Sequence, residues 1–190
     1  MKKALLIACV LFIAVISTAC INNIAVQELN NKAAEYMQKG DYESAINRLQ
    51  ASLDLDSTMY QTYYNLGIAA TNAKKYEMAI EAFESGIKIK PDYNNFYYSL
   101  GVAQSEFADT IVETTYFDEI KNDTVKKEIT TEDKNKAEGL KALAVENLKK
   151  YLELNPQAED KETVETLIND CSKFGEIETA EETKTIEVDG

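Results

Sequence analysis

Apolar and small residues return along the chain at a fixed interval of 34 residues. The stretches TYYNLG (62–67) and FYYSLG (96–101) place Tyr, Leu and Gly at matching positions. A fixed period of roughly 20 to 50 residues is typical of stacked repeats, in which each unit buries its apolar face against its neighbours. Large residues fill the space between such units, and small residues let two helices approach closely. The pattern therefore predicts an all-α array of helical hairpins rather than a catalytic motif.

The first two units follow this register closely. Ala45 and Ala79 are 34 residues apart, which places one repeat at residues 26–59 and the next at 60–93. Because a single hairpin cannot bury its apolar face alone, about three such units are needed for a stable stack.

The third unit, residues 94–156, opens in register but closes late. Its second helix, around Ala144, lies 31 residues beyond the position that a strict repeat requires. The two prolines of the chain, Pro91 and Pro156, nevertheless occupy the same repeat position. Each is expected to end a helix, because proline cannot continue one.

Most of these extra residues fall in an insertion at about 109–136. It is rich in Thr, Val, Ile and aromatic residues, and Asn122 with Asp123 could mark a turn between two short extended pieces. We expect an exposed loop with a weak hairpin, followed by a helix that Thr131 or Asp133 could cap. Such a long insertion is either a functional loop or a solvated, variable segment.

After the last repeat, the chain predicts a capping helix at residues 158–173. Four apolar residues fall at i, i+3, i+4 and i+7, namely Val164, Leu167, Ile168 and Cys171. Cys171 is expected to be a small buried hydrophobic residue, with a reactive or intermolecular thiol as the alternative. The repeat domain then spans residues 26–174, and the acidic tail at 175–190 is expected to be disordered.

The first residues of the chain have the pattern of an export signal. Lys2 and Lys3 precede an apolar run at residues 4–16, and small residues follow. This is a basic region, an apolar region and a cleavage site, and the run is shorter than the roughly 20 residues of a membrane span.

The string STAC, which ends at Cys20, resembles the lipobox of bacterial lipoproteins. It departs from that pattern at Ser17, where Leu is usual. The resemblance implies that residues 1–19 are removed and that Cys20 becomes a diacylglycerol-modified, acylated N-terminus, followed by a short tether at 20–25. An ordinary signal peptide with an incidental cysteine is the alternative. Two or more acyl chains would hold the protein firmly at a membrane.

Composition narrows the range of functions. The 190 residues carry a formal charge of −13 with a pI near 4.5, and they include no His. An acidic surface disfavours nucleic acid as a partner, and the absence of His removes the commonest catalytic base and metal ligand. Carboxylate pairs such as Glu81 with Glu84, or Asp118 with Glu119, are more typical of solvated faces. We therefore expect no enzyme, no metal and no cofactor.

The second repeat resembles the tetratricopeptide repeat. The matching residues are Tyr63, Leu66, Gly67, Ala79, Phe83 and Pro91. Ala70 stands where that family typically has an aromatic residue. The resemblance covers about residues 26–107 and 138–156. It implies a right-handed superhelix whose concave groove is lined by the first helix of each repeat and usually holds a segment of a partner protein.

Family positions assign a partner-binding groove to twelve residues of this chain. They are Gln27, Asn30, Ala34 and Met37 from the first repeat, Gln61, Tyr64, Ile68 and Thr71 from the second, and Asn95, Tyr98, Val102 and Ser105 from the third. Tyr64 and Tyr98 offer apolar area with a hydroxyl group, which suits a binding surface, although both could instead pack on neighbouring helices.

One subclass of the family binds a C-terminal carboxylate with Lys or Arg in the groove. Those positions hold Asn30, Asn95 and Ser99 here, so we do not expect that function. We expect instead a lipid-anchored adaptor of the bacterial envelope, on the periplasmic face or the cell surface, that binds a protein or peptide. A binder of a small molecule or glycan, an enzyme using carboxylates of the insertion, and self-association through the first repeat are the alternatives.

Overall fold

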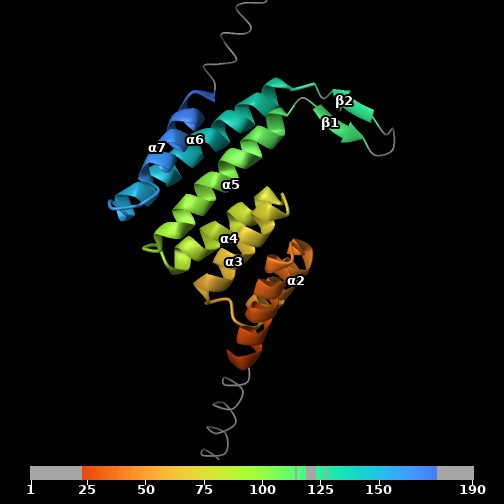
Figure 1. Ribbon diagram of the computed structural model, residues 1–190, viewed down its shortest axis with the longest axis vertical. Coiled ribbons are helices and arrows are strands. Elements are labelled where there is room, and N and C mark those ends of the chain that lie inside the picture. The colour runs from red at the N-terminus through yellow and green to blue at the C-terminus, as the bar shows by residue number, and fades with distance from the viewer. Residues whose placement is uncertain (1–22, 114, 119–122, 127, 175–190) are drawn as a thin grey trace, which may run out of the picture.

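The computed structural model describes residues 23–113, 115–118, 123–126 and 128–174. Residues 23–38 form the first described helix. The elements that follow are α2 (Tyr42–Leu55), α3 (Tyr60–Asn72), α4 (Tyr76–Ile89), α5 (Asn94–Val112), β1 (Thr115–Asp118), β2 (Asp123–Lys126), α6 (Thr131–Leu154) and α7 (Lys161–Ser172). The hairpins stack from α2 at one end to α7 at the other (Figure 1), which confirms the predicted helical solenoid.

Glycines and a phenylalanine ring explain the close packing of α3 on α4. A Cβ added to Gly67 would collide with the ring of Phe83, which is fully buried. A Cβ on Gly86 would likewise collide with Phe96 on the next hairpin. Burying a phenylalanine side chain contributes about 1.5–3 kcal/mol, so each glycine stabilises the stack by making room for a ring.

One apolar cluster runs through the first two repeats and into the third. Its buried members are Ala33, Ala45, Ile46, Leu49, Leu66, Ala69, Ala70, Ala79, Ala82, Phe83, Phe96, Leu100 and Ala103. Alanines at the helix crossings and larger residues between the hairpins are the arrangement that the sequence predicts.

The third hairpin is longer than the others and carries a small β-hairpin at its end. Strands β1 and β2 pair antiparallel, with Thr115 opposite Lys126, and they project beyond the ends of α5 and α6 (Figure 1). This confirms the expected extended pieces. The insertion is shorter than the predicted 109–136, because buried Ile111 and Ala137 pack together and keep both helix ends regular.

Helix α6 begins one residue earlier than a cap at Thr131 would place it, and three residues earlier than a cap at Asp133 would. Thr130 is the N-cap, and its hydroxyl accepts a hydrogen bond from the Asp133 N–H at 3.0 Å. The Asp133 carboxylate accepts in return from the Thr130 N–H at 3.1 Å. This reciprocal capping box satisfies two backbone donors at the start of the helix.

Helix α7 covers the last hairpin, as predicted, although it spans 161–172 rather than 158–173. Two turns in the backbone occupy the intervening residues, since Ala158 N–H donates to Asn155 and Lys161 N–H donates to Ala158. Val164 and Cys171 are buried against the third repeat. The predicted buried state of the Cys171 thiol is therefore confirmed.

The start of the described chain differs from the predicted tether at 20–25. Residues 23–25 are already helical, because Val26 is 1% exposed and is packed from the first turn onward. The signal at 1–19, Cys20 and the tail at 175–190 lie outside the described residues. Within the described part, no helix combines the length and the apolar character needed to cross a membrane.

Candidate partner-binding groove

The first helices of adjacent repeats, α3 and α5, enclose a pocket of about 240 Å³. Its lining is Ile68, Thr71 and Asn72 from α3 and Tyr98, Ser99, Val102 and Glu106 from α5. Four of these residues were predicted as groove positions from the sequence. The structure thus brings Ile68, Thr71, Tyr98 and Val102 together around one hollow.

Three residues of this pocket, Asn72, Ser99 and Glu106, are not among the twelve assigned groove residues, although Ser99 was named from the sequence as a carboxylate-binding position of the family. Asn72 and Glu106 are 34 residues apart and each follows a predicted groove residue. The sequence signal was therefore present, but the predicted stripe was one residue too narrow on each helix.

A second pocket, of about 420 Å³, lies between α5 and α7. Its lining is Ser105, Asp109, Lys141, Leu167, Asp170, Cys171 and Phe174. Val102, Ser105, Glu106 and Asp109 fall at i, i+3, i+4 and i+7 of α5, so they share one helix face. This single face lines both pockets, one on each side of it.

Ser105 lies deeper than the other predicted groove residues. It is 4% exposed, because α6 and α7 both pack over it. Its hydroxyl accepts a hydrogen bond from Lys141 Nζ at 2.8 Å and lies 3.4 Å from Cys171 Sγ. Lys141 Nζ also pairs with Asp109 Oδ1 at 2.7 Å. The buried ammonium is thus neutralised by one carboxylate and held by one hydroxyl, as a buried charge requires.

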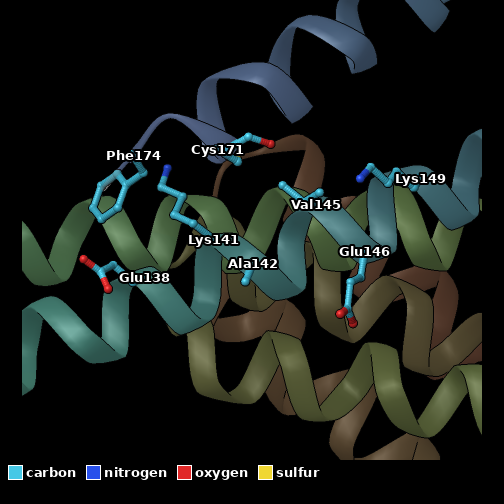
Figure 2. Close-up of a pocket in the computed structure, with 9 residues that line it drawn as sticks. Glu138, Lys141, Ala142, Val145, Glu146, Lys149, Cys171 and Phe174 are labelled. Atoms are coloured by element: carbon cyan, nitrogen blue, oxygen red, sulfur yellow. The ribbon is translucent and has the colours of Figure 1, made fainter. Parts of the chain in front are cut away.

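Lys141 also borders a third hollow, of about 480 Å³, between α6 and α7. Figure 2 shows the Phe174 ring and the Lys141 amine turned toward one another beside Cys171. The amine lies 5.1 Å from the ring centroid. Glu138, Glu146 and Lys149 also line this hollow.

Tyr64 is half-buried and packs inside the stack rather than on the pocket. Its ring meets Phe83, Tyr93 and Phe96 at centroid distances of 6.1, 5.5 and 5.6 Å. Its hydroxyl accepts a weak hydrogen bond from Ser99 at 3.5 Å. Tyr64 thus holds the second and third hairpins together.

Tyr98 lines the first pocket and packs against Tyr151 of α6. Its ring lies 5.3 Å from that of Tyr151 at an angle of 52°. The Tyr151 hydroxyl donates a hydrogen bond to Asp160 Oδ1 at 2.8 Å. Burial, and then this hydrogen bond, raise the pKa of Tyr151 above its usual value. Tyr98 is therefore backed by a neutral phenol at any physiological pH.

Asn30 forms a polar junction between the first two repeats. Its side-chain amide donates to Ser52 Oγ at 2.7 Å and to the Val26 carbonyl at 2.9 Å, and it accepts from the Thr62 hydroxyl at 3.2 Å. Ser52 and Thr62 are both fully buried. The amide is thus engaged between helices.

The other predicted groove residues differ in their exposure. Gln27, Ala34, Gln61 and Asn95 are exposed, whereas Met37 is half-buried against the main core. The Asn95 amide donates to the Tyr93 hydroxyl at 3.2 Å, and the Gln27 amide donates to Asn23 at 2.8 Å.

The side chains that line the pocket between α3 and α5 are mostly uncharged. The pocket between α3 and α5 contains hydroxyl, amide and carboxylate groups over an apolar floor and carries no cationic side chain. In the part of the chain that the structure describes, no group of three His, Cys, Asp or Glu residues could hold a metal ion.

Comparison with known families decides the nature of the repeat. A tetratricopeptide repeat model matches residues 60–93, and a second model, described as TPR repeat, matches residues 33–70. Residues 33–93 therefore match the tetratricopeptide repeat. No curated protein sequence matches the chain.

Solved tetratricopeptide domains share the fold at low sequence identity. The TPR domain of Arabidopsis OM64 has a TM-score of 0.57 at 14% identity, covering 77% of this chain and 96% of its own. The second TPR domain of human RPAP3, in complex with an HSP70 peptide, gives 0.56 at 16%, covering 78% and 98%. The Yersinia enterocolitica type III secretion chaperone SycD, in complex with a peptide of the translocator YopD, gives 0.55 at 16%, covering 80% and 93%.

Proposed function

We propose that this tetratricopeptide protein is a non-catalytic adaptor that binds a segment of a partner protein on its inner face. The pocket between α3 and α5 is the observation that carries the proposal, because four predicted groove residues converge on it. Neighbours of the same fold, RPAP3 and SycD, are solved in complex with peptides. The half-buried Tyr98, held from behind by Tyr151, offers the rigid aromatic surface that binding sites favour.

We further propose that the adaptor is exported and lipid-anchored at Cys20 to a bacterial membrane. The support is the sequence alone: the basic start, the apolar run at residues 4–16 and the lipobox-like string STAC. An anchor with two or more acyl chains would place the repeats within reach of partners at the membrane surface.

A crosslinking pull-down from native membranes tests the binding proposal. Asn72→Trp places a bulky ring at the mouth of the pocket, and it removes only the bond that Asn72 donates to the Ile68 carbonyl. Asn47→Trp is the matched control, because Asn47 is exposed on α2. We expect wild type and Asn47→Trp to capture the same partner protein in similar amounts. Asn72→Trp should capture about tenfold less of it.

Equal capture by all three proteins, each confirmed as folded by circular dichroism, would refute a partner in this pocket. The anchor is tested in the same cells, since Cys20→Ala should leave the membrane fraction and lose the mass of the acyl groups. If Cys20→Ala stays in the membrane fraction and keeps the mass of wild type apart from the substitution, the lipid anchor at Cys20 is refuted.

A further inference from the structure

The two pockets present carboxylates that make no ion pair with any cation among the residues that the structure describes. Glu106 lines the pocket between α3 and α5, and Asp170 lines the pocket between α5 and α7. Both side chains are exposed. Within the described ranges, neither carboxylate makes an ion pair.

The cation that lines the second pocket, Lys141, is already engaged. Its side chain is 8% exposed, and its amine is held by Asp109 and Ser105 at 2.7 and 2.8 Å. Lys32, on the helix at 23–38, pairs with Glu28 at 2.8 Å. The groove therefore keeps a negative potential, which the net charge of −13 of the whole chain reinforces.

The two pockets and the two carboxylates alternate across one surface. Glu106 stands on the α5 face that both pockets share, and Asp170 stands on the opposite wall of the second pocket. Apolar floor is present on both sides, from Val102 and Ile68 in the first pocket and from Leu167 and Phe174 in the second.

We propose that the segment bound in this groove is cationic, with an apolar side chain in each pocket and Lys or Arg residues that meet Glu106 and Asp170. The inference rests on the proposed adaptor function and specifies its partner. Charge complementarity of this kind favours the correct partner and raises the rate of encounter. An acidic segment is disfavoured, since the groove positions Asn30, Asn95 and Ser99 supply no cation to receive it.

Synthetic peptides provide the probe. Three series of 12-residue fluorescent peptides share two Leu anchors at every spacing from one to six residues, and they carry Lys, Gln or Glu at the remaining polar positions. Binding to the full chain in a neutral detergent is measured by fluorescence anisotropy at low and high salt. We expect the best Lys peptide to bind at least about tenfold more tightly than its Glu counterpart and to weaken as salt rises.

The double variant Glu106→Gln/Asp170→Asn should weaken the best Lys peptide about fivefold and abolish its preference over the Gln peptide. The matched control, Asp54→Asn/Glu84→Gln, removes two exposed carboxylates from the outer helices α2 and α4 and should change nothing. A loss confined to the control pair would place the cationic segment on the outer face and overturn the proposal.

Asn72→Trp separates this proposal from the adaptor function. If all three series bind equally and Asn72→Trp abolishes their binding, the groove stands and the cationic partner is refuted. If the Lys series binds and Asn72→Trp leaves its affinity unchanged, both the cationic partner and the binding groove between α3 and α5 are refuted. Binding by no series overturns the cationic partner, and the pull-down then decides the groove by itself.

Discussion

At the scale of single residues, glycine has two different roles in this protein. Gly67 is required because the Phe83 ring occupies the space that a Cβ would need. Gly139, on α6, is exposed and has nothing within 4 Å of a built Cβ. Both glycines lie inside helices. Helix propensity alone would therefore predict the same gain in stability when either is replaced by alanine.

We therefore predict opposite effects for two identical substitutions. Gly67→Ala should lower the free energy of unfolding by about 1–3 kcal/mol, because overpacking displaces Phe83. Gly139→Ala should raise it by about 0.5–1 kcal/mol, because alanine loses less backbone entropy in a helix. Urea denaturation followed by circular dichroism measures both, and a stabilised Gly67→Ala would contradict the packing explanation.

At the scale of helices, the ends are held by short polar contacts at the surface. Asp41 is the N-cap of α2 and accepts from the Ser44 N–H at 3.1 Å. The Ser44 side chain, and then its backbone N–H, hold the pKa of the Asp41 carboxyl below its ordinary value. A depressed folded-state pKa contributes stability above the unfolded pKa, and that stability is lost as pH falls through the lower folded pKa.

Asp41→Asn separates the charge of this cap from its hydrogen bond, because asparagine caps a helix about as well as aspartate. The variant should resemble wild type near pH 7. As the pH falls below about 4, the ordinary aspartate pKa, wild type should lose more of its thermal stability than Asp41→Asn does. Melting temperatures of both proteins between pH 3 and pH 7 check this, and parallel curves would refute it.

The helices and their pairing could be predicted from the sequence because the register is a local, repeated signal. The prolines, the alanines and the Tyr-Leu-Gly strings all indicated the same hairpins. The inner face was predicted less well. Ser105 was assigned to the groove, but the sequence has no signal for the way α6 and α7 pack over it, because α7 lies outside the repeat pattern. Glu106 was missed because the family's groove positions on α5 end at Ser105, and Glu106 is the next residue along the helix.

At the scale of the whole molecule, the third hairpin departs from the uniform stack. Its extended ends have a small core of their own around Ala108, Ile111 and Ala137. Phe107 joins this extension to the second repeat by stacking on Tyr76 at 5.6 Å, and the Lys136 amine lies 4.6 Å from the Phe107 ring centroid. The extension is thus attached to the solenoid at its base.

Removal of the β-hairpin should leave the stack intact. Replacing residues 114–128 with a short Gly/Ser linker retains the Thr130 cap and the buried contacts of Ala108, Ile111 and Ala137 at the hairpin ends. A shorter loop also costs slightly less closure entropy. We expect the melting temperature to stay within a few degrees of wild type. A cooperative unfolding transition lost in the shortened protein would show that the hairpin belongs to the folding unit.

The polar junction at Asn30 limits which repeat units can be lost or exchanged. The same position in the next unit is Tyr64, and the partners of Asn30, Ser52 and Thr62, correspond there to Gly86 and Phe96. In the third unit Tyr98 meets Tyr151. Each junction thus has its own complementary chemistry, so the units are not interchangeable modules. Loss of the middle unit would put Phe96 in the place of Thr62. The Asn30 side-chain oxygen would then lose the hydrogen bond that it accepts from Thr62, at a cost of about 1–3 kcal/mol, so the order of the units is encoded in their contacts.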